Sequence, residues 1–393
     1  MLADDAKAET LVQSKLGDPW WREALFMASG STESKRRASQ LIRALIDAQA
    51  GGERHEHLVL AAECVLDVGE VRVEGDLLGD IKRRLQREAE APEPAKGKQD
   101  HRRGWLLRRI AALNALSRIE SGQLSGAAGS RYWKPDTGEP DWVTIPAGEF
   151  WMGSEEQDKV AFDSERPARR VALGEYQIAR VPITNAQYAL FVTEANVDPP
   201  EHWRGRQPPK GKEDHPVVNV SWHDAQAYGR WLAGKIGRAV RLPTEAEWEK
   251  AARGDRDGRR YPWGDAWGEL MCNSGELGLG DTSPVGLFLS GASPYGVLDM
   301  AGNVWEWCQS KYKPYPYDAD DGREDLRGDY HRVLRGGSFN VDRRGVRCAF
   351  RFNPHPHPGD RFVSLGYRVV VVSPGPRAAR PRGRCAERRV SPA

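Results

Sequence analysis

A long stretch without regular periodicity, from about residue 255 to about residue 330, most constrains how this chain can fold. It consists mainly of Gly, Pro, Asp, Trp and Tyr, and the whole chain contains 41 Gly and 14 Trp. Long loops in a compact domain are usually functional or specially stabilised. Large aromatic side chains can stabilise them by burying extensive apolar surface. The sequence therefore predicts a loop-rich domain held together by aromatic residues rather than by long regular elements.

Length, charge and cysteine content narrow the possible classes of protein. A chain of 393 residues can form two or three domains with a sizeable core. Its net charge is only +2, so bulk electrostatics favours neither nucleic acid nor membrane as a partner. The five Cys show no Cys-x-x-Cys or Cys/His zinc spacing. Since we also find no signal peptide and no apolar run of membrane-spanning length, we expect a reduced, cytoplasmic protein.

Composition divides the chain into four parts. Residues 1–120 are predicted to be a helical domain, because apolar residues recur there in four stripes with helical spacing. The stripes begin at Leu41, Leu58, Leu77 and Leu106. Residues 121–140 are rich in Gly and Ser and are predicted to be a linker. Residues 141–373 are the predicted main domain, and residues 374–393, with six Arg among Pro, Gly and Ala, are predicted to be a disordered tail.

The main domain shows both strand and helix patterns. Strand-forming residues occur at 142–153, where Gly and Pro interrupt them, and again at 171–181 and 369–372. Residues that commonly cap helix N-termini precede three apolar runs. These caps are Thr184, Ser221 and Thr244. The pattern predicts a mixed α+β domain.

The segment from Phe339 to Ser364 has the composition of a recognition surface. Aromatic residues, His, Arg, Asn and Asp alternate there without periodicity, between two stretches that look like fixed framework, Arg335–Ser338 and Leu365–Val369. Aromatic residues and Arg are frequent hot spots of interfaces. We therefore predict a set of ligand-binding residues and no catalytic residues in this segment. The set is Phe339, Asn340, Val341, Asp342, Arg343, Arg344, Arg347, Phe350, Phe352, Asn353, His355, His357, Asp360, Phe362 and Ser364.

Seven motifs between Trp142 and Val372 resemble those of the formylglycine-generating-enzyme/sulfatase-modifying-factor family, in the family's order. They are Ile145–Ser154 (IPAGEFWMGS), Pro216–Trp222 (PVVNVSW), Arg241–Glu249 (RLPTEAEWE), Tyr261–Asp265 (YPWGD), Gly302–Trp307 (GNVWEW), Arg335–Ser338 (RGGS) and Gly366–Val369 (GYRV). The resemblance implies an α+β, C-type-lectin-like domain, here preceded by a small all-α domain.

Family resemblance does not by itself imply the family's enzymatic activity. The enzymes use a copper-binding cysteine pair shortly after Gly-Gly-Ser, and Val341 and Val346 stand at those places here. Valine offers no thiolate to a soft Cu(I) ion. The related iron-dependent sulfoxide synthases use three His of an N-terminal bundle, and His55, His57 and His101 do not match that spacing. We therefore expect no copper, no iron and no catalysis, with an oxidase or sulfoxide synthase as the alternative.

A second branch with this fold fits the segment better. Arg332–Ser338 through Gly366–Val369 resembles, in place and length, the variable region of the variable proteins of diversity-generating retroelements, which is rewritten at template adenines. Randomising the adenines of an Asn codon cannot yield Lys, Glu, Gln, Met or Trp. Residues 339–364 contain none of these five types. We therefore expect a diversified binding face for a protein or other macromolecular ligand. A structural or signalling module without diversification is a further alternative.

Two further expectations concern other parts of the chain. The sequence resembles the helical region that follows the ATPase core of NACHT-type NTPases at Gly17–Gly30, Leu41–Leu45 and Ala61–Leu66. This resemblance implies an adaptor, or one half of a split receptor, with a signalling NTPase as partner. A self-contained helical spacer is the alternative. In the resembling family the stretch around Asn303 and Glu306 helps to hold structural calcium, an ion that binds six to eight oxygens. We expect calcium there, with Asn273 and Asp281 as candidates for a second ion.

Overall fold

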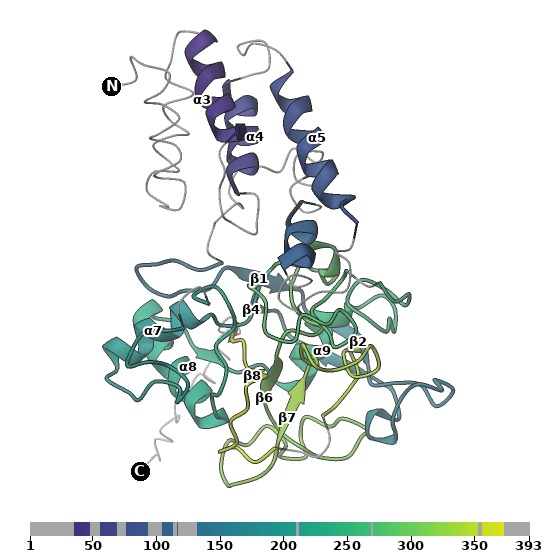
Figure 1. Cartoon of the computed structure of the whole chain (residues 1–393). Helices are drawn as coiled ribbons and strands as arrows, with labels where there is room; N and C mark the ends of the chain where they lie inside the picture. The colour runs from purple at the N-terminus through teal and green to yellow at the C-terminus, as the bar shows by residue number, and fades with distance from the viewer. Residues whose placement is uncertain are drawn as a thin grey trace, which may run out of the picture.

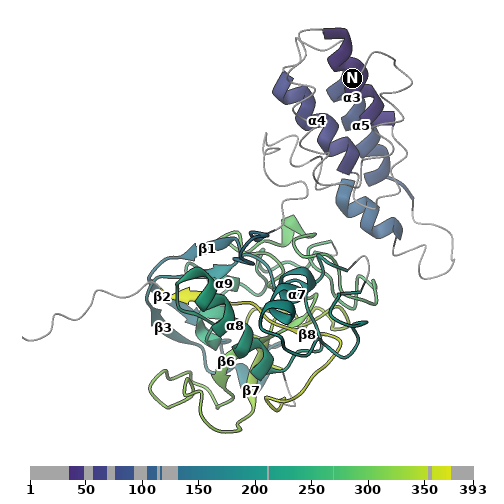
Figure 2. The ribbon, with the colours of Figure 1, turned by 90° about the vertical axis from the view of Figure 1, so that its left-hand side faces the viewer.

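Three helices stand together at one end of the molecule, and a mixed domain of helices and short strands forms the rest (Figure 1 and Figure 2). The computed structural model describes residues 35–47, 56–68, 76–92, 104–112, 116, 132–209, 212–268, 270–352 and 356–372. The predicted order of an all-α part followed by an α+β domain is confirmed. The predicted tail lies outside the described residues, and so does Gly17–Gly30 of the NACHT-like pattern.

The N-terminal helices are built on the predicted apolar stripes. They are α3 (Lys35–Asp47), α4 (Glu56–Val68) and α5 (Leu77–Ala89). Leu41, Leu58 and Leu77 are buried in one shared core, so the first three stripes face one another. The fourth stripe, which begins on a helix over residues 104–112, is divided: Leu106 packs against the main domain, whereas Leu116 packs against the core of the other three stripes. No helix in the described part of the chain combines the length and apolarity needed to cross a membrane.

The contact between the helix at 104–112 and the main domain is apolar. Trp105 and Leu106 share a buried cluster with Leu277, Leu287 and Phe288, which belong to the long irregular stretch. The indole nitrogen of Trp105 also donates to the carbonyl of Ala91 at 3.1 Å. The helical part is therefore joined to the loops of the main domain by side-chain packing as well as by the chain.

Short strands form three small sheets in the main domain. The largest has the order β1-β4-β9-β5 with antiparallel neighbours, the second pairs β2 with β3, and the third has the order β7-β6-β8. In the third sheet β6 runs antiparallel to β7 and parallel to β8. The strands are β1 (Trp142–Ile145), β2 (Gly148–Met152), β3 (Arg169–Leu173), β4 (Tyr176–Ala179), β5 (Val240–Arg241), β6 (Trp305–Lys311), β7 (Arg332–Arg335), β8 (Leu365–Gly366) and β9 (Val370–Val372).

The single strand predicted over residues 171–181 is two strands in different sheets. β3 pairs with β2, whereas β4 lies between β1 and β9. Gly174 and Glu175 separate them, so the chain leaves one sheet and enters the other within two residues. Strand-forming residues on both sides concealed this change of partner, because pairing is a tertiary property that propensity does not encode.

The predicted helix starts are confirmed. The hydroxyls of Ser221 and Thr244 accept hydrogen bonds from the amides of Asp224 and Glu247, both at 3.1 Å. Thr184 caps its helix in the same way. The helices are α7 (Asn185–Glu194), α8 (Trp222–Ile236) and α9 (Glu245–Arg253), with 3-10 turns η2 (Asp163–Glu165) and η3 (Leu289–Gly291).

The ordered domain begins before the predicted boundary at residue 141. Residues 132–140, assigned to the linker from composition, form a turn in which Trp133 is buried and bridges to Pro140. The amide of Lys134 donates to the carbonyl of Glu139 at 2.8 Å. A large buried aromatic residue anchors this part of the Gly/Ser-rich stretch to the domain.

The long irregular stretch is stabilised as predicted, by aromatic packing and close backbone contacts. Tyr261 stacks on Trp263 with ring centroids 5.1 Å apart, and Trp267 meets Tyr261 edge-on. Gly302 has φ +74°, and a β-carbon there would lie 2.1 Å from the carbonyl oxygen of Asn273. Only glycine allows this approach of two loop segments.

Buried ion pairs tie the sheets to the helices. The carboxylate of Glu306 on β6 accepts from Arg368 at 2.6 and 2.7 Å and from the indole of Trp248 at 2.9 Å. Arg335 on β7 donates to Glu249 of α9. Arg335, Arg368 and both carboxylates are fully buried. Arg335 and Arg368 thus brace the framework through buried carboxylates.

Replacing Arg368 by Leu should lower the free energy of unfolding by about 3–5 kcal/mol, because Glu306 would be left buried without its partner. Denaturant unfolding measures the change. Arg170→Ala is the matched control, since its pair with Glu149 is more than half exposed and should contribute roughly 0–1 kcal/mol. Similar losses for both variants would show that the buried pair does not brace the fold.

The buried carboxyl group of Asp299 makes the stability of the fold depend on pH. Burial raises the pKa of Asp299 from 3.8 to about 6, against the hydrogen bond from the Gly286 amide and the charge of Arg368. Between these pH values the folded state keeps a proton that the unfolded state has lost. Stability therefore falls as pH rises through this window, by up to about 3 kcal/mol.

An Asp299→Asn variant should escape this loss. Relative to the unmodified protein, its free energy of unfolding should increase by about 3 kcal/mol from below pH 3.8 to above pH 6. Unfolding curves of both proteins across this range measure the difference, in which the titrations of other groups cancel. A difference that does not change with pH would contradict the assignment.

Candidate functional site

The segment 339–364 reaches the protein surface between two buried stretches of the chain. Every residue from 332 to 338 and from 365 to 371 is buried. No residue of 339–344 or of 359–364 is buried, whereas 345–349 are. Exposure thus begins and ends at the bounds predicted from the sequence, with a buried section between two exposed ones.

The first exposed section carries polar side chains on a tight turn. Asn340, Asp342, Arg343 and Arg344 are exposed, and Phe339 and Val341 are half-buried. Asp342 accepts from the amide of Arg344 at 2.9 Å, which fixes the turn. The guanidinium of Arg343 lies 3.5 Å from Glu276, and that of Arg344 lies 5.2 Å from the ring centre of Phe162. Both arginines are therefore available to a ligand.

The central section lies inside the protein. Arg347, predicted to bind ligand, is only 2% exposed, and its guanidinium donates to both oxygens of Glu165 at 2.7 and 2.6 Å. Arg351 is bound in the same way by Glu245 at 2.6 Å. The placement of Arg347 on the surface was wrong, because composition cannot distinguish an exposed arginine from one with a buried carboxylate partner.

Aromatic residues connect the two exposed sections. Phe350 and Phe352 are half-buried and contact the ring of Trp305, with centroids 5.8 and 4.8 Å away. Phe162, from another part of the chain, meets Phe350 edge-on at 5.4 Å and is 42% exposed. The amide of Trp305 donates to the carbonyl of Ser364 at 2.8 Å, so the end of the segment reaches the same cluster.

The second exposed section is held at both ends. Asp360 accepts from the amide of His357 at 2.8 Å, and the imidazole of His357 lies 2.9 Å from the carboxylate of Asp329. Phe362 is 47% exposed, and its carbonyl accepts from the amide of Asn219 at 3.0 Å. Two further predicted residues, Asn353 and His355, lie outside the described residues.

The places of the family's copper ligands are apolar. Val346 is buried with Tyr261 and Cys272, and Val341 packs against the same cluster. Burial raises the pKa of Cys272 and of Cys348 to about 12, so neither is a thiolate near neutral pH. Among the described residues, no group of three or more His, Cys, Asp or Glu could hold a metal ion. The residues present do not fit a thiolate copper site.

The predicted calcium pair already has protein partners. The side chain of Asn303 bonds to the backbone of Ser283 at 3.0 and 3.2 Å. Arg368 and the Trp248 indole bind the carboxylate of Glu306. A guanidinium thus stands where a cation would bind, so Glu306 does not fit a calcium ligand.

The neighbouring loop fits calcium better. Asn273 Oδ1, Ser274 Oγ and Ser283 Oγ are buried oxygens without a hydrogen-bond partner. The side-chain Nδ2 of Asn273 donates to the carbonyl of Asp281 at 2.9 Å, which closes the loop. Unpaired buried oxygens are costly, and oxygen is the ligand that calcium prefers. Calcium binding itself stays a prediction.

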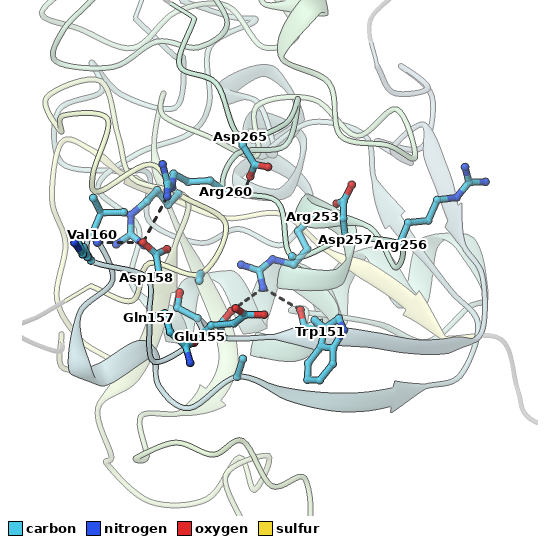
Figure 3. A pocket seen from close by; sticks show the side chains of 17 residues that line it. Trp151, Glu155, Gln157, Asp158, Val160, Arg253, Arg256, Asp257, Arg260 and Asp265 are labelled. Carbon is cyan, nitrogen blue, oxygen red and sulfur yellow. Dashed lines mark hydrogen bonds and ion pairs between the residues drawn. The ribbon is translucent and has the colours of Figure 1, made fainter.

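A polar cavity of about 660 Å³ adjoins the buried section of the segment. Its walls come from the loop after β2, from the end of α9 with the loop that follows, and from Arg347 and Ala349 (Figure 3). Sequence reasoning missed it. The available signal was the run Arg253–Arg260 (RGDRDGRR), with one Arg at the end of α9 and three in the loop that follows.

Comparison with known proteins supports the resemblance drawn from the motifs. A Formylglycine-generating enzyme of Thermomonospora curvata is 36% identical over 255 residues, covering 50% of this chain and 82% of its own length. A Hercynine oxygenase of Mycolicibacterium smegmatis is 35% identical over 271 residues, covering 58% of this chain and 60% of its own length. These relatives are named as enzymes, which contradicts the prediction that the chain catalyses nothing.

The fold has counterparts among solved structures. PvdO from Pseudomonas aeruginosa matches with a TM-score of 0.52 and 26% identity, covering 61% of this chain and 97% of PvdO. Treponema denticola variable protein 1 matches with a TM-score of 0.49 and 24% identity, covering 58% and 94%. The match to PvdO, together with the family model, confirms the predicted α+β, C-type-lectin-like architecture. The model of the Sulfatase-modifying factor enzyme 1-like domain matches residues 131–372, and the chain belongs to this family.

Proposed function

We propose that residues 339–344 and 356–364, with the aromatic cluster between them, form a ligand-binding face, and that the chain is a variable protein of a diversity-generating retroelement. The observation that carries the proposal is the exposure pattern: both flanks are buried, and the side chains of 339–344 and 359–364 are not. A scaffold with these properties can accept many sequences on its face without losing its core.

The chemistry of the face suits a protein partner. Exposed Arg343 and Arg344 supply charged donors, and Phe362 supplies an apolar contact. Half-buried Phe350 and Phe352 extend the apolar surface around Trp305. Aromatic residues and Arg are the residues most often found at the energetic centre of protein interfaces.

Catalysis of the kind for which the relatives are named is a second candidate function. Identity of 36% over 255 residues to a Formylglycine-generating enzyme favours it. Val341 and Val346 mean that such activity would not use thiolates at the family's copper positions. Oxygen uptake by the purified protein, together with stoichiometric bound copper or iron, would support this candidate over the binding function.

The N-terminal helices fit an adaptor role within the same proposal. Their apolar residues form a buried core of their own. The helix at 104–112 joins them to the main domain through the contact cluster of Leu106 and Phe288. A signalling NTPase in the cytoplasm is the partner we propose for them, on the resemblance of their sequence to helical regions of NACHT-type proteins.

Sequencing this gene and its surroundings in independent isolates tests the retroelement role. We expect a near-copy of the 3′ end that differs mostly at adenines, beside a reverse transcriptase gene. Substitutions should concentrate at exposed positions such as Asn340, Arg343 and Phe362. Arg347 and Arg351 should stay constant, since their loss would leave Glu165 and Glu245 buried and unpaired.

The buried framework residues 332–338 are the internal control for that comparison. Substitutions spread evenly over the domain, or the lack of any near-copy, would contradict the retroelement role. Variation that falls on Arg347 as often as on Arg343 would show that burial does not decide which positions vary.

We also propose a structural calcium ion in the loop 273–283. Calcium at about 100 times its Kd should then raise the free energy of unfolding by about 2.7 kcal/mol over a chelated sample. A double variant, Ser274→Ala with Ser283→Ala, should lose most of this gain. In chelator it should be no less stable, because two unpaired hydroxyls are removed. Equal calcium responses of both proteins would exclude this loop as the site.

A further inference from the structure

The polar cavity is formed where three remote parts of the chain meet. Arg253 lies near the centre of the view in Figure 3, with Arg260 and Asp158 to one side and Asp257 and Arg256 to the other. Val341 and Val346, at the family's copper positions, do not line it. The cavity is therefore a separate feature from the ligand-binding face and from the place of the copper ligands.

The guanidinium of Arg253 is a buried positive charge held in place by backbone carbonyls. It is 3% exposed, and one of its terminal nitrogens donates to the carbonyls of Trp151 at 3.0 Å and Gly153 at 2.7 Å. Glu249 lies 3.2 Å away but is also bound by Arg335. The Nε of Arg253 is buried and has no partner in the protein. A buried, unused donor on a guanidinium is costly unless an acceptor reaches it.

Arg260 repeats this arrangement on another wall. Its Nε is also buried without a partner, and its terminal nitrogen is 3.5 Å from Asp158, at the long limit of a hydrogen bond. Its backbone is anchored independently of the side chain, because its amide donates to Asp265 and its carbonyl accepts from Cys348. The guanidinium is thus held at the cavity with unused donor capacity.

Four carboxylates line the cavity, on Glu155, Asp158, Asp257 and Asp265, against five positive side chains, so the lining has one positive charge in excess. Arg259 binds Asp257 at 2.6 and 2.9 Å and lowers its pKa. Asp265 is engaged by the amide of Arg260. Exposed Lys159 and Arg256 add two more positive charges to the lining.

We propose that this cavity binds a small molecule through an oxyanion group, a carboxylate or a phosphate, held between Arg253 and Arg260. Guanidinium groups bind such groups with paired, charge-assisted hydrogen bonds. A volume of about 660 Å³ exceeds that of an isolated phosphate, so the anion belongs to a larger molecule. Trp151, Val160 and Ala168 provide apolar lining for the rest of it.

Calorimetric titration at constant ionic strength tests the proposal, with citrate as the carboxylate probe, glucose 6-phosphate as the phosphate probe and glucose as the neutral control. We expect saturable binding of at least one anion and none of glucose. The variant is Arg260→Leu, which removes a cavity guanidinium and leaves the backbone anchors. It should weaken binding at least tenfold.

Arg327→Leu is the matched control, because this arginine is 90% exposed and neither it nor its partner Asp325 lines the cavity. Its affinity should stay within about twofold of the unmodified protein, and melting curves of both variants confirm that they are folded. Binding to neither anion, or an equal loss in the two variants, overturns the proposal. Failure here leaves the ligand-binding face unaffected, since that face does not include Arg260.

Discussion

Buried arginine–carboxylate pairs are the interactions on which this domain depends. Glu245 and Glu249, on α9, bind Arg335 of β7 and Arg351 of the segment 339–364. Burial alone would raise the pKa of Glu245, but the charges of Arg351 and Arg335 outweigh it and lower the pKa. Loss of either partner would leave an uncompensated buried charge, so each pair keeps two chain segments together.

These pairs also explain how a surface segment can change while the domain persists. The segment enters the interior between its two exposed sections, and Arg347 and Arg351 anchor it there through Glu165 and Glu245. Short strands contribute little regular structure at this edge, so the ionic anchors and the aromatic contacts of Trp305 replace a continuous sheet. The buried residues of the segment thus stabilise the fold, and the proposed recognition uses the exposed ones.

Membership of a family with many enzymes favours catalysis, whereas the residues of this chain do not fit the copper chemistry of that family. The relatives are named for enzymatic activities, and the scaffold is shared with them over residues 131–372. Val341 and Val346 nevertheless pack into an apolar cluster at the family's metal positions. A shared scaffold does not by itself determine one chemistry, because function depends on the side chains of the site.

Features that depend on local chemistry follow from the order of residues alone. The caps at Ser221 and Thr244, the framework motifs and the bounds of the segment at 339 and 364 could all be predicted, since each rests on neighbouring residues. The fold sets the long-range partner of each residue. It divided 171–181 between two sheets, buried Arg347 on Glu165, engaged Glu306 with Arg368 and assembled the cavity around Arg253. The sequence does not show whether a charged side chain is surrounded by water or paired with a carboxylate from a distant part of the chain. The fold decides this, because it brings the two groups together.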